Sequence, residues 1–275
     1  MKFDGLFKEA LSHDANSIIK DSMLYSALAP SKHLRAKLIE AVVLDYGGDS
    51  TTVHAATTAL EMIQTYSLIH DDLPAMDDDD MRRNQLSNHK QFDEATAILA
   101  GDALLTKAFE HVVDSDYPDH TKLAIIKELS YASGCSGMIL GQSMDMNPSS
   151  IKTNNDILKM YSLKTGMLFG AALAIGTILC DLGDRVDNYR SIGQTLGVAF
   201  QVQDDLLEDE KSEEELGKSK SDEKNNKMTM VTLSGKEEAM YITKNAFNDS
   251  LESLMAYQEH KHVVALINKI QNRGY

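Results

Sequence analysis

Apolar residues recur along most of the chain at the three- and four-residue spacing that is typical of amphipathic helices. In the segment EATAILAGDALLTKAFEHVV, Ile98, Leu105 and Phe109 fall on one stripe, with Leu104 and Ala108 beside it. The segment SLMAYQEHKHVVALINKIQ shows a similar stripe, and all four prolines fall at breaks between apolar segments. Neither an alternating strand pattern nor an Asn-Gly hairpin signal stands out. The sequence therefore predicts an all-α protein.

Two stretches depart from the amphipathic pattern. The run between Lys164 and Asp181 carries no charge, but it is shorter than the roughly 18–20 residues of a membrane-spanning helix, so we expect a buried core helix. Residues 208–228 are rich in charge and predict a mobile surface loop, which could also close as a lid over an anionic ligand. Because no Pro/Gly/Ser-rich linker divides the chain, we expect a single domain over residues 1–275.

Charge and cysteine content narrow the partners and the compartment. With 42 acidic and 27 basic residues the net charge is −15, which argues against nucleic acid or an anionic membrane as the main partner. Cys135 and Cys180 lie in apolar segments without CxxC spacing, so we expect two buried thiols in a reducing compartment. The N-terminus shows no signal-peptide pattern. These features predict a cytoplasmic protein without membrane insertion, in which an anionic ligand would need local basic residues or metal ions.

The most unusual stretch of the chain is SLIHDDLPAMDDDDMRRN, in which an acidic cluster follows the end of an apolar segment. Asp71 and Asp72 stand next to each other at the end of the segment, and Asp77 follows about one loop later. Two arginines, Arg82 and Arg83, come directly behind the cluster. Taken alone, the stretch would equally fit an acidic helix end on the surface.

A second cluster repeats the design in LGVAFQVQDDLLED. Asp204 and Asp205 again end an apolar segment, and Glu208 lies four residues after Asp204, so both carboxylates would project from one helix face and repel each other unless a cation lies between them. Carboxylates without His or Cys are hard oxygen ligands that suit Mg²⁺, which fills its other positions with water and phosphate oxygens. Two such clusters facing each other across a bundle would hold Mg²⁺ around a diphosphate.

Basic residues could complete such a site. Besides the two arginines of the first cluster, the candidates are Lys32, Arg35, Lys164, Lys218 and Lys227. Arginine suits bidentate contact with a phosphate group, and lysine acts as a point charge. Together with the two acidic clusters, they predict a binding site for small-molecule diphosphates.

At this point the motifs resemble those of the bacterial short-chain trans-polyprenyl diphosphate synthases. SLIHDDLPAMDDDDMRR is very close to their first aspartate-rich motif (DDxxxxD), and AFQVQDDLLE is similar to their second (DDxxD). The segments EATAILAGDALLTKAFE, GMILGQSMD, YSLKTG and LGKSKSDEKNNKMT match in family order, so the resemblance covers essentially the whole chain. It implies one large helical bundle of the isoprenoid synthase type around a deep cavity, usually a homodimer. The implied reaction joins isopentenyl diphosphate head to tail to an allylic diphosphate, with three Mg²⁺.

The resemblance also assigns roles to individual residues. The catalytic set would be Asp71, Asp72, Asp77, Asp204, Asp205 and Lys164. The metal would be held by Asp71, Asp77, Asp204 and, partly through bound water, Glu208. The allylic diphosphate would contact Arg82, Lys164, Thr165, Gln201, Lys218 and Lys227. Isopentenyl diphosphate would contact Lys32, Arg35, Gln64 and Arg83.

Product length is implied by the residues around the first motif. In this family bulk just upstream of the motif stops the growing chain, and here Tyr66 lies five residues before Asp71, with Pro74-Ala75 inserted in the motif. This combination resembles the bacterial farnesyl diphosphate synthases, whose product has fifteen carbons. A geranylgeranyl product is the nearest rival, and Tyr66 could also be an ordinary core aromatic residue.

Three departures from the family pattern gather around the isopentenyl diphosphate positions. PSKHLRA keeps Lys32 and Arg35 but lacks the glycines, the first arginine and the proline of GGKRxRP. Gln64 replaces a histidine, and Asn84-Gln85-Leu86-Ser87 replaces Gly-x-Pro-Thr. The chain would then be either an active enzyme or a weakly active or regulatory subunit that mainly binds allylic diphosphate.

A class I terpene cyclase is the alternative with similar metal chemistry. Its second motif requires Ser/Thr and then Glu at successive four-residue intervals after the first ligand. Counting from Asp204 gives Glu208 and Ser212, and counting from Asp205 gives Asp209 and Glu213. Neither register fits, so we do not expect a cyclase.

Overall fold

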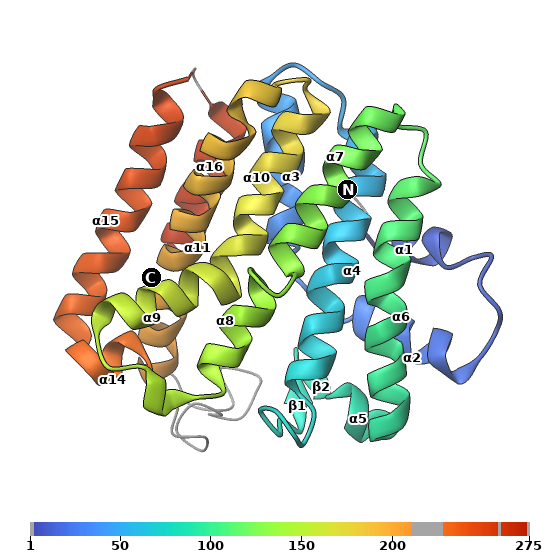
Figure 1. Cartoon of the computed structure of the whole chain (residues 1–275), viewed down its shortest axis with the longest axis horizontal. Helices are drawn as coiled ribbons and strands as arrows, with labels where there is room; N and C mark the ends of the chain where they lie inside the picture. Colours follow the sequence, from blue (N-terminus) through green and yellow to red (C-terminus); the bar gives the residue numbers. More distant parts are fainter. Residues whose placement is uncertain (1–2, 211–227, 258–259, 274–275) are drawn as a thin grey trace.

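A computed structural model describes residues 3–210, 228–257 and 260–273 as a bundle of mainly parallel and antiparallel helices (Figure 1). In chain order the helices are α1 (Phe3–Ala10), α2 (Ile18–Ala27), α3 (Leu34–Asp45), α4 (His54–Asp71), α5 (Asn88–Gln91), α6 (Glu94–Val113), α7 (Asp119–Ser133), α8 (Met138–Asp145), α9 (Asn154–Tyr161), α10 (Met167–Leu179), α11 (Val186–Glu210), α14 (Met230–Ser234), α15 (Lys236–Met255) and α16 (Lys261–Gln271). The prediction of an all-α fold is confirmed.

A small hairpin interrupts the helices. Strands β1 (Met81–Arg82) and β2 (Gln85–Leu86) pair in antiparallel register. Arg83 and Asn84 form the two-residue turn with φ of 55° and 63°, the left-handed values that a type I′ turn needs at both positions. Asparagine tolerates this conformation better than most residues, so the hairpin forms without the glycine that usually marks it.

Helix α10 is the centre of the bundle. Every residue from Met167 to Thr177 is buried, and the helix packs against α3, α4, α7 and α11. Within the described residues, one continuous helical stretch, Asn154–Leu179, has the length and composition that could cross a membrane, but 72% of its apolar window is buried inside the protein. The prediction of a buried core helix is confirmed.

Glycines allow α10 and α11 to approach each other closely. A Cβ atom on Gly197 of α11 would lie 2.5 Å from the Cα atom of Gly166, a distance that no side chain can occupy. The close approach places the π-helical turn Ser162–Gly166, which carries Lys164, directly against α11. Such π turns occur often at functional sites, because they redirect side chains within a helix.

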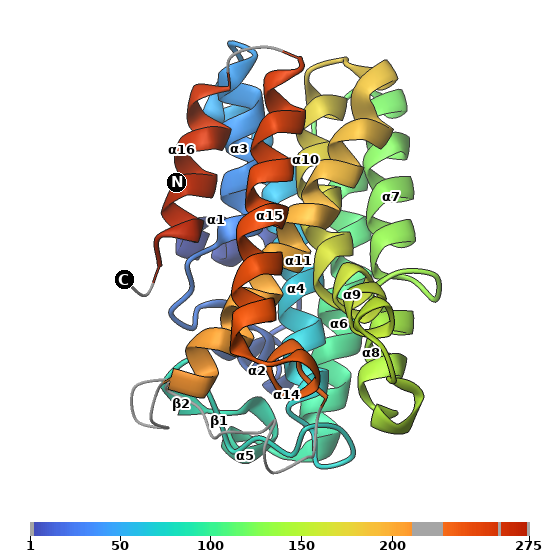
Figure 2. The same cartoon turned by 90° about the vertical axis from the view of Figure 1, so that its left-hand side faces the viewer.

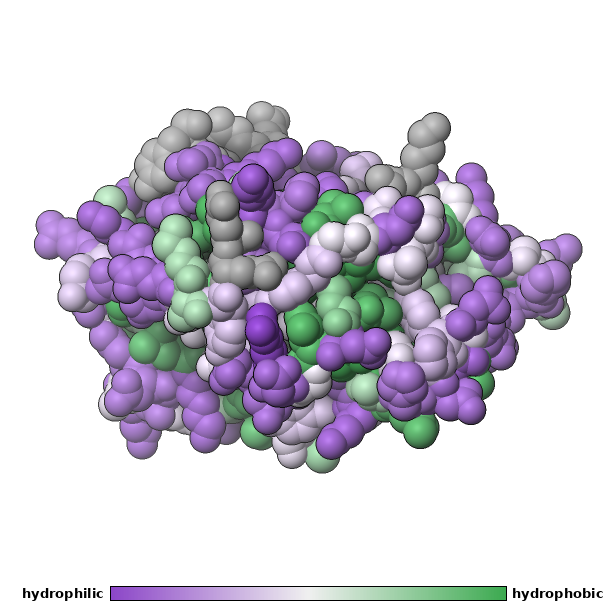
Figure 3. Space-filling view, turned by 90° about the horizontal axis from the view of Figure 1, so that it is seen from above, coloured by the Kyte–Doolittle hydropathy of each residue, from purple (hydrophilic) through white to green (hydrophobic). Residues whose placement is uncertain are grey.

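Both acidic helix ends lie at the same end of the bundle. α4 and α11 run toward the end that carries β1 and β2, and each reaches its aspartate pair there (Figures 1 and 2). The opposite end presents a mainly hydrophilic surface with scattered apolar patches (Figure 3). The fold therefore concentrates the candidate chemistry at one end.

The buried face of α6 differs from the prediction. Ile98 is 44% exposed, and Leu105 and Phe109 are only partly buried, whereas Leu104 and Ala108 are fully buried. Small residues let α6 pack closely on α4, because a short side chain permits a short distance between helix axes. The buried stripe therefore lies one residue before the predicted one, on smaller side chains.

The C-terminal segment forms two helices and not one. α15 ends at Met255 and α16 begins at Lys261. The carboxylate of Asp45, at the end of α3, accepts the backbone N–H groups of His262 (2.8 Å) and Val263 (3.0 Å) and so caps the start of α16. A residue distant in sequence thus fixes this boundary.

The expectation of two buried cysteines is wrong for one of them. Cys135 is exposed because it lies in the turn between α7 and α8, whereas Cys180 is partly buried at the end of α10. Burial raises the pKa of the Cys180 thiol to about 11, so it stays protonated at neutral pH.

Candidate active site

A cavity of about 960 Å³ opens at the end of the bundle where α4 and α11 terminate. Its wall includes fourteen of the residues that the sequence singled out: Lys32, Arg35, Gln64, Tyr66, Asp71, Asp77, Arg82, Arg83, Lys164, Thr165, Gln201, Asp204, Asp205 and Glu208. Asp72 lies behind this wall, and Lys218 and Lys227 fall outside the described residues. Residues separated by more than 150 positions in the chain, such as Lys32 and Asp204, thus meet around one space.

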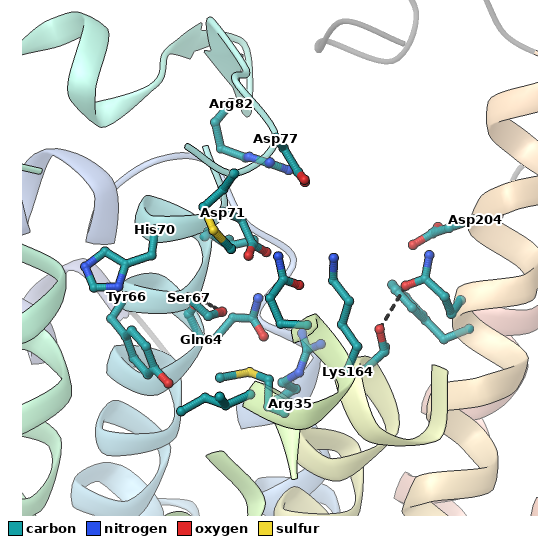
Figure 4. Close-up of a pocket in the computed structure, with 18 of the residues that line it drawn as sticks. Arg35, Gln64, Tyr66, Ser67, His70, Asp71, Asp77, Arg82, Lys164 and Asp204 are labelled. Carbon is teal, nitrogen blue, oxygen red and sulfur yellow. Dashed lines mark hydrogen bonds between the residues drawn. The ribbon is translucent and has the colours of Figure 1, made fainter. Parts of the chain in front are cut away.

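The two acidic clusters lie on opposite walls of the cavity. Asp71 and Asp77 come from the end of α4 and the loop after it, and Asp204 comes from α11 across the gap (Figure 4). The backbone N–H of Asp77 donates to the carbonyl of Asp71 (2.8 Å), which folds the loop back so that both side chains reach the cavity. Lys164 stands between the two walls (Figure 4).

Asp72 is buried behind the first wall. It accepts hydrogen bonds from Arg82, through Nε at 2.8 Å and through Nη2, and its residue is only 2% exposed. Burial raises the pKa of Asp72 to about 6, and the charge and hydrogen bonds of Arg82 oppose this rise. Burial would lower the pKa of Arg82, but the carboxylates of Asp72, Asp71 and Asp79 together outweigh burial and raise the pKa. Asp72 therefore orients Arg82.

Asp205 has the corresponding position behind the second wall. It accepts hydrogen bonds from the hydroxyl of Tyr161, the backbone N–H of Met230 (3.2 Å) and the amide of Gln201 (3.3 Å). These donors come from α9, α14 and α11, so one buried carboxylate joins three helices. Although Asp205 reaches the cavity surface, its contacts are those of a structural anchor.

Helix geometry explains why the members of each pair differ. Consecutive residues of an α-helix point about 100° apart, so two adjacent aspartates point in clearly different directions. Asp71 and Asp204 are partly exposed, whereas Asp72 and Asp205 are buried. In both pairs the first aspartate is the more exposed one, and the second is buried among protein groups.

The donor set suits a hard divalent cation. The acidic side chains of the cavity offer carboxylate oxygens alone, the ligand type that Mg²⁺ prefers. Across the described ranges 3–210, 228–257 and 260–273, no three His, Cys, Asp or Glu side chains are close enough to hold a metal ion by themselves. Any ion would therefore need additional oxygens from water or from a ligand spanning the two walls.

Two partly buried arginines, Arg35 of α3 and Arg83 of the hairpin turn, line the cavity. Arg35 stacks over the Phe169 ring at 4.7 Å, and its Nε atom has no hydrogen-bond partner among the described residues. Burial lowers the pKa of Arg35 to about 10 and also lowers that of Arg83, while Glu61 opposes both shifts. A guanidinium group whose buried Nε atom lacks a hydrogen-bond partner, as in Arg35, favours an anionic ligand.

Position 33 lies behind the cavity wall. The Nδ1 atom of His33 is 2.8 Å from the carboxylate of Glu61, and the His33 ring stacks on Phe3 at 4.1 Å. His33 also has a φ of 46°, directly before α3. His33, which replaces the first arginine of the family pattern, therefore fixes the loop that carries Lys32. Its side chain does not line the cavity.

On the wall formed by α8 and α11, the π turn brings polar groups together. Lys164 donates to Asp145 at 2.6 Å, and the Thr165 hydroxyl donates to Gln201 Oε1 at 2.9 Å. A Cβ atom on Gly141 of α8 would lie 2.2 Å from the backbone nitrogen of Lys164, so this glycine is needed for the close packing of α8 on the turn.

Tyr66 lies deeper, one and a half turns before Asp71 on α4. It is 5% exposed, its hydroxyl has no hydrogen-bond partner among the described residues, and burial raises its pKa to about 12. Its ring meets His70 edge-on at 5.8 Å. The side chain therefore presents bulk to the cavity next to the first acidic cluster (Figure 4).

Several residues of the site were missed from the sequence. Glu61 contacts His33, Tyr161 binds Asp205, and Arg273 reaches the cavity from the end of α16. Tyr161 begins the segment YSLKTG, which matches the family pattern, so the sequence could have pointed to it. Arg273 gave no such signal, because nothing near it in the sequence links it to the second acidic cluster.

Comparisons with known proteins agree with this geometry. The polyprenyl synthetase family matches residues 16–270. A farnesyl diphosphate synthase of Micrococcus luteus is 41% identical over 95% of this chain and 91% of its own length. The geranylgeranyl pyrophosphate synthase 4 of Arabidopsis thaliana is 35% identical over 94% of this chain and 71% of its own. The crystal structure of a Helicobacter pylori geranyltransferase, complexed with magnesium and isoprenyl diphosphate, superposes with a TM-score of 0.84 at 29% identity, covering 98% and 93% of the two chains.

Proposed function

The chain belongs to the polyprenyl synthetase family, and on this premise we propose that it is a prenyltransferase that forms farnesyl diphosphate. It would join isopentenyl diphosphate to dimethylallyl or geranyl diphosphate, head to tail. The observation that carries the proposal is the pair of ligand-facing carboxylate clusters on opposite walls of one cavity that also contains lysine and arginine side chains.

The described residues divide into two diphosphate positions. Asp71, Asp77, Asp204 and Glu208 would hold magnesium on the allylic diphosphate, with three ions expected from the family, and Lys164, Thr165 and Gln201 would contact its oxygens. Lys32, Arg35, Gln64 and Arg83 would bind isopentenyl diphosphate. Magnesium, when bound, supplies positive charge that stabilises the departing diphosphate.

These positions suit ionisation followed by coupling. When the allylic C–O bond breaks, both electrons leave with the diphosphate, and Lys164 and Arg82 stabilise the added charge at fixed positions. The double bond of isopentenyl diphosphate then attacks the allylic cation, and the proton lost after coupling goes to the released diphosphate. Apolar wall residues, among them Leu105, Met138 and Phe200, exclude water that would quench the cation.

Tyr66 favours a fifteen-carbon product, because its buried ring would block a longer chain beside α4. Geranylgeranyl synthesis is the second candidate, since a relative with that name also matches most of the chain. We further propose that the chain is one catalytic domain that acts as a homodimer in the cytoplasm.

The test is a product assay with labelled isopentenyl diphosphate, Mg²⁺, and dimethylallyl or geranyl diphosphate as primer. A dominant farnesyl product supports the whole proposal, and a twenty-carbon product keeps the enzyme class but removes the role of Tyr66. Absence of elongation, with allylic diphosphate still binding in the presence of Mg²⁺, would instead identify a regulatory or binding relative.

A further inference from the structure

Arg273 lies against a carboxylate of the second acidic cluster. It follows α16, and its Nη2 atom is 2.7 Å from Oδ1 of Asp204. The Arg273 side chain is 13% exposed and the Asp204 side chain is 40% exposed, and both line the cavity. A guanidinium group from the C-terminal end of the chain thus occupies the same carboxylate that the proposed function assigns to a metal ion.

Arg273 has several contacts besides Asp204. Its Nε atom donates to Gln203 Oε1 (2.7 Å), its Nη2 atom donates to the carbonyl of Phe200 (2.8 Å), and its guanidinium lies 3.6 Å from the centre of the Phe200 ring. Gln203 also donates to the carbonyl of Gln271, which fastens the end of α16 to α11. Three contacts outside the carboxylate, two hydrogen bonds and the ring of Phe200, therefore hold the guanidinium.

The charge of Arg273 matters because of the spacing in α11. Asp204 and Glu208 lie four residues apart and both line the cavity, so their carboxylates repel each other. A fixed cation beside Asp204 reduces this repulsion before any ligand arrives. Arg273 thereby supplies the counter-charge that the spacing of the second cluster requires.

We propose that Arg273 is a positioning residue that holds Asp204 through this ion pair, and that a divalent cation must displace Asp204 from Arg273 to bind the second cluster. This inference rests on the proposed function, because it takes Asp204 as a metal ligand. Since the guanidinium is fixed by Phe200 and Gln203, the exchange moves the Asp204 side chain and leaves α16 in place.

The direction of the effect follows from competition. A carboxylate oxygen that accepts a hydrogen bond from a guanidinium has to give up that bond, or share it, when a metal ion coordinates it. Removing the guanidinium without changing the fold should therefore make metal binding tighter by about three- to tenfold, which corresponds to the loss of one partly exposed charged hydrogen bond.

The experiment measures binding of Mn²⁺ alone, followed by the electron paramagnetic resonance signal of the unbound ion. Mn²⁺ accepts the same oxygen ligands as Mg²⁺ and can be counted directly. The variants are Arg273→Gln and Arg273→Lys, with Arg190→Gln as the matched control. The control removes the same positive charge, here from an ion pair with Glu128. Arg190 lies on the same helix as Asp204, about 20 Å away along the helix axis. Circular dichroism melting verifies that each variant is folded.

We expect Arg273→Gln to lower the Mn²⁺ dissociation constant about three- to tenfold, Arg273→Lys to lie between it and the wild type, and Arg190→Gln to match the wild type. Unchanged or weaker Mn²⁺ binding in Arg273→Gln would overturn the inference, and if that variant does not fold, wild-type binding in Arg273→Lys would do so. If the wild type elongates the primer but Arg273→Gln does not bind Mn²⁺ more tightly, this inference fails and the proposed function stands. A wild type that neither binds Mn²⁺ nor elongates removes both.

Discussion

The two aspartates of the second pair should fail in different ways when each is replaced by asparagine. Asp205 accepts three hydrogen bonds from Tyr161, Met230 and Gln201 and is 6% exposed, whereas the Asp204 side chain is 40% exposed. An asparagine at 205 keeps one oxygen but turns an amide donor toward other donors. The change should cost about 2–4 kcal/mol of unfolding free energy, since it weakens charged hydrogen bonds at a buried site.

Asp204→Asn should behave differently. It removes a partly exposed ion pair with Arg273, so the unfolding free energy should change by less than about 1 kcal/mol, while activity is lost with the charge of a proposed metal ligand. In a chain of this size, the loss at Asp205 corresponds to a fall in melting temperature of roughly 5–15 °C. Differential scanning calorimetry without ligands, together with the product assay, measures both quantities. The assignment of roles within the pair is refuted if Asp205→Asn melts like the wild type while Asp204→Asn melts markedly lower.

Three further predictions concern other parts of the chain. Tyr66→Ala should shift the product toward twenty carbons by opening the cavity beside α4; chromatography of the products checks this, and an unchanged fifteen-carbon product contradicts it. His33→Ala should raise KM for isopentenyl diphosphate about three- to tenfold with the allylic KM unchanged, because the contact with Glu61 fixes the loop of Lys32; equal changes in both values would point to general damage. Burial lowers the pKa of His260, so the unfolded chain binds more protons and stability should fall as the pH drops below about 6.5. Urea unfolding of wild type and His260→Gln at pH 7 and 5 tests this, and parallel pH profiles would exclude it.

The sequence predicted the helical class and the two acidic clusters because both are written in local patterns. Apolar spacing reports a buried helix face, and carboxylates at the end of such a segment report a polar cavity beside it. Local patterns do not report the size of the neighbouring residue, and for that reason the stripe through Ile98 was misplaced: the contact with α4 selects small side chains. They also do not report a cap from a distant residue, as Asp45 provides for α16.

Within the site, composition could not separate ligand-facing from supporting residues. Asp71 and Asp72 are identical in chemistry and adjacent in sequence, and only the direction of each side chain relative to α4 distinguishes them. The same holds for Asp204 and Asp205 on α11. Arg273 illustrates a second limit: its partner comes from another helix, so the contact exists only after α16 has docked on α11.

The departures from the family pattern differ in their structural consequences. His33 lies behind the wall, where its contact with Glu61 still fixes the loop of Lys32. Asn84 adopts a φ of 63°, so the turn that carries Arg83 keeps a left-handed conformation without glycine. Gln64 lines the cavity and retains a hydrogen-bonding side chain there. A relative that had lost its acceptor site would be expected to show basic residues turned outward or a collapsed pocket. Here Lys32, Arg35 and Arg83 still line one cavity with Gln64, which supports an active enzyme over a binding subunit.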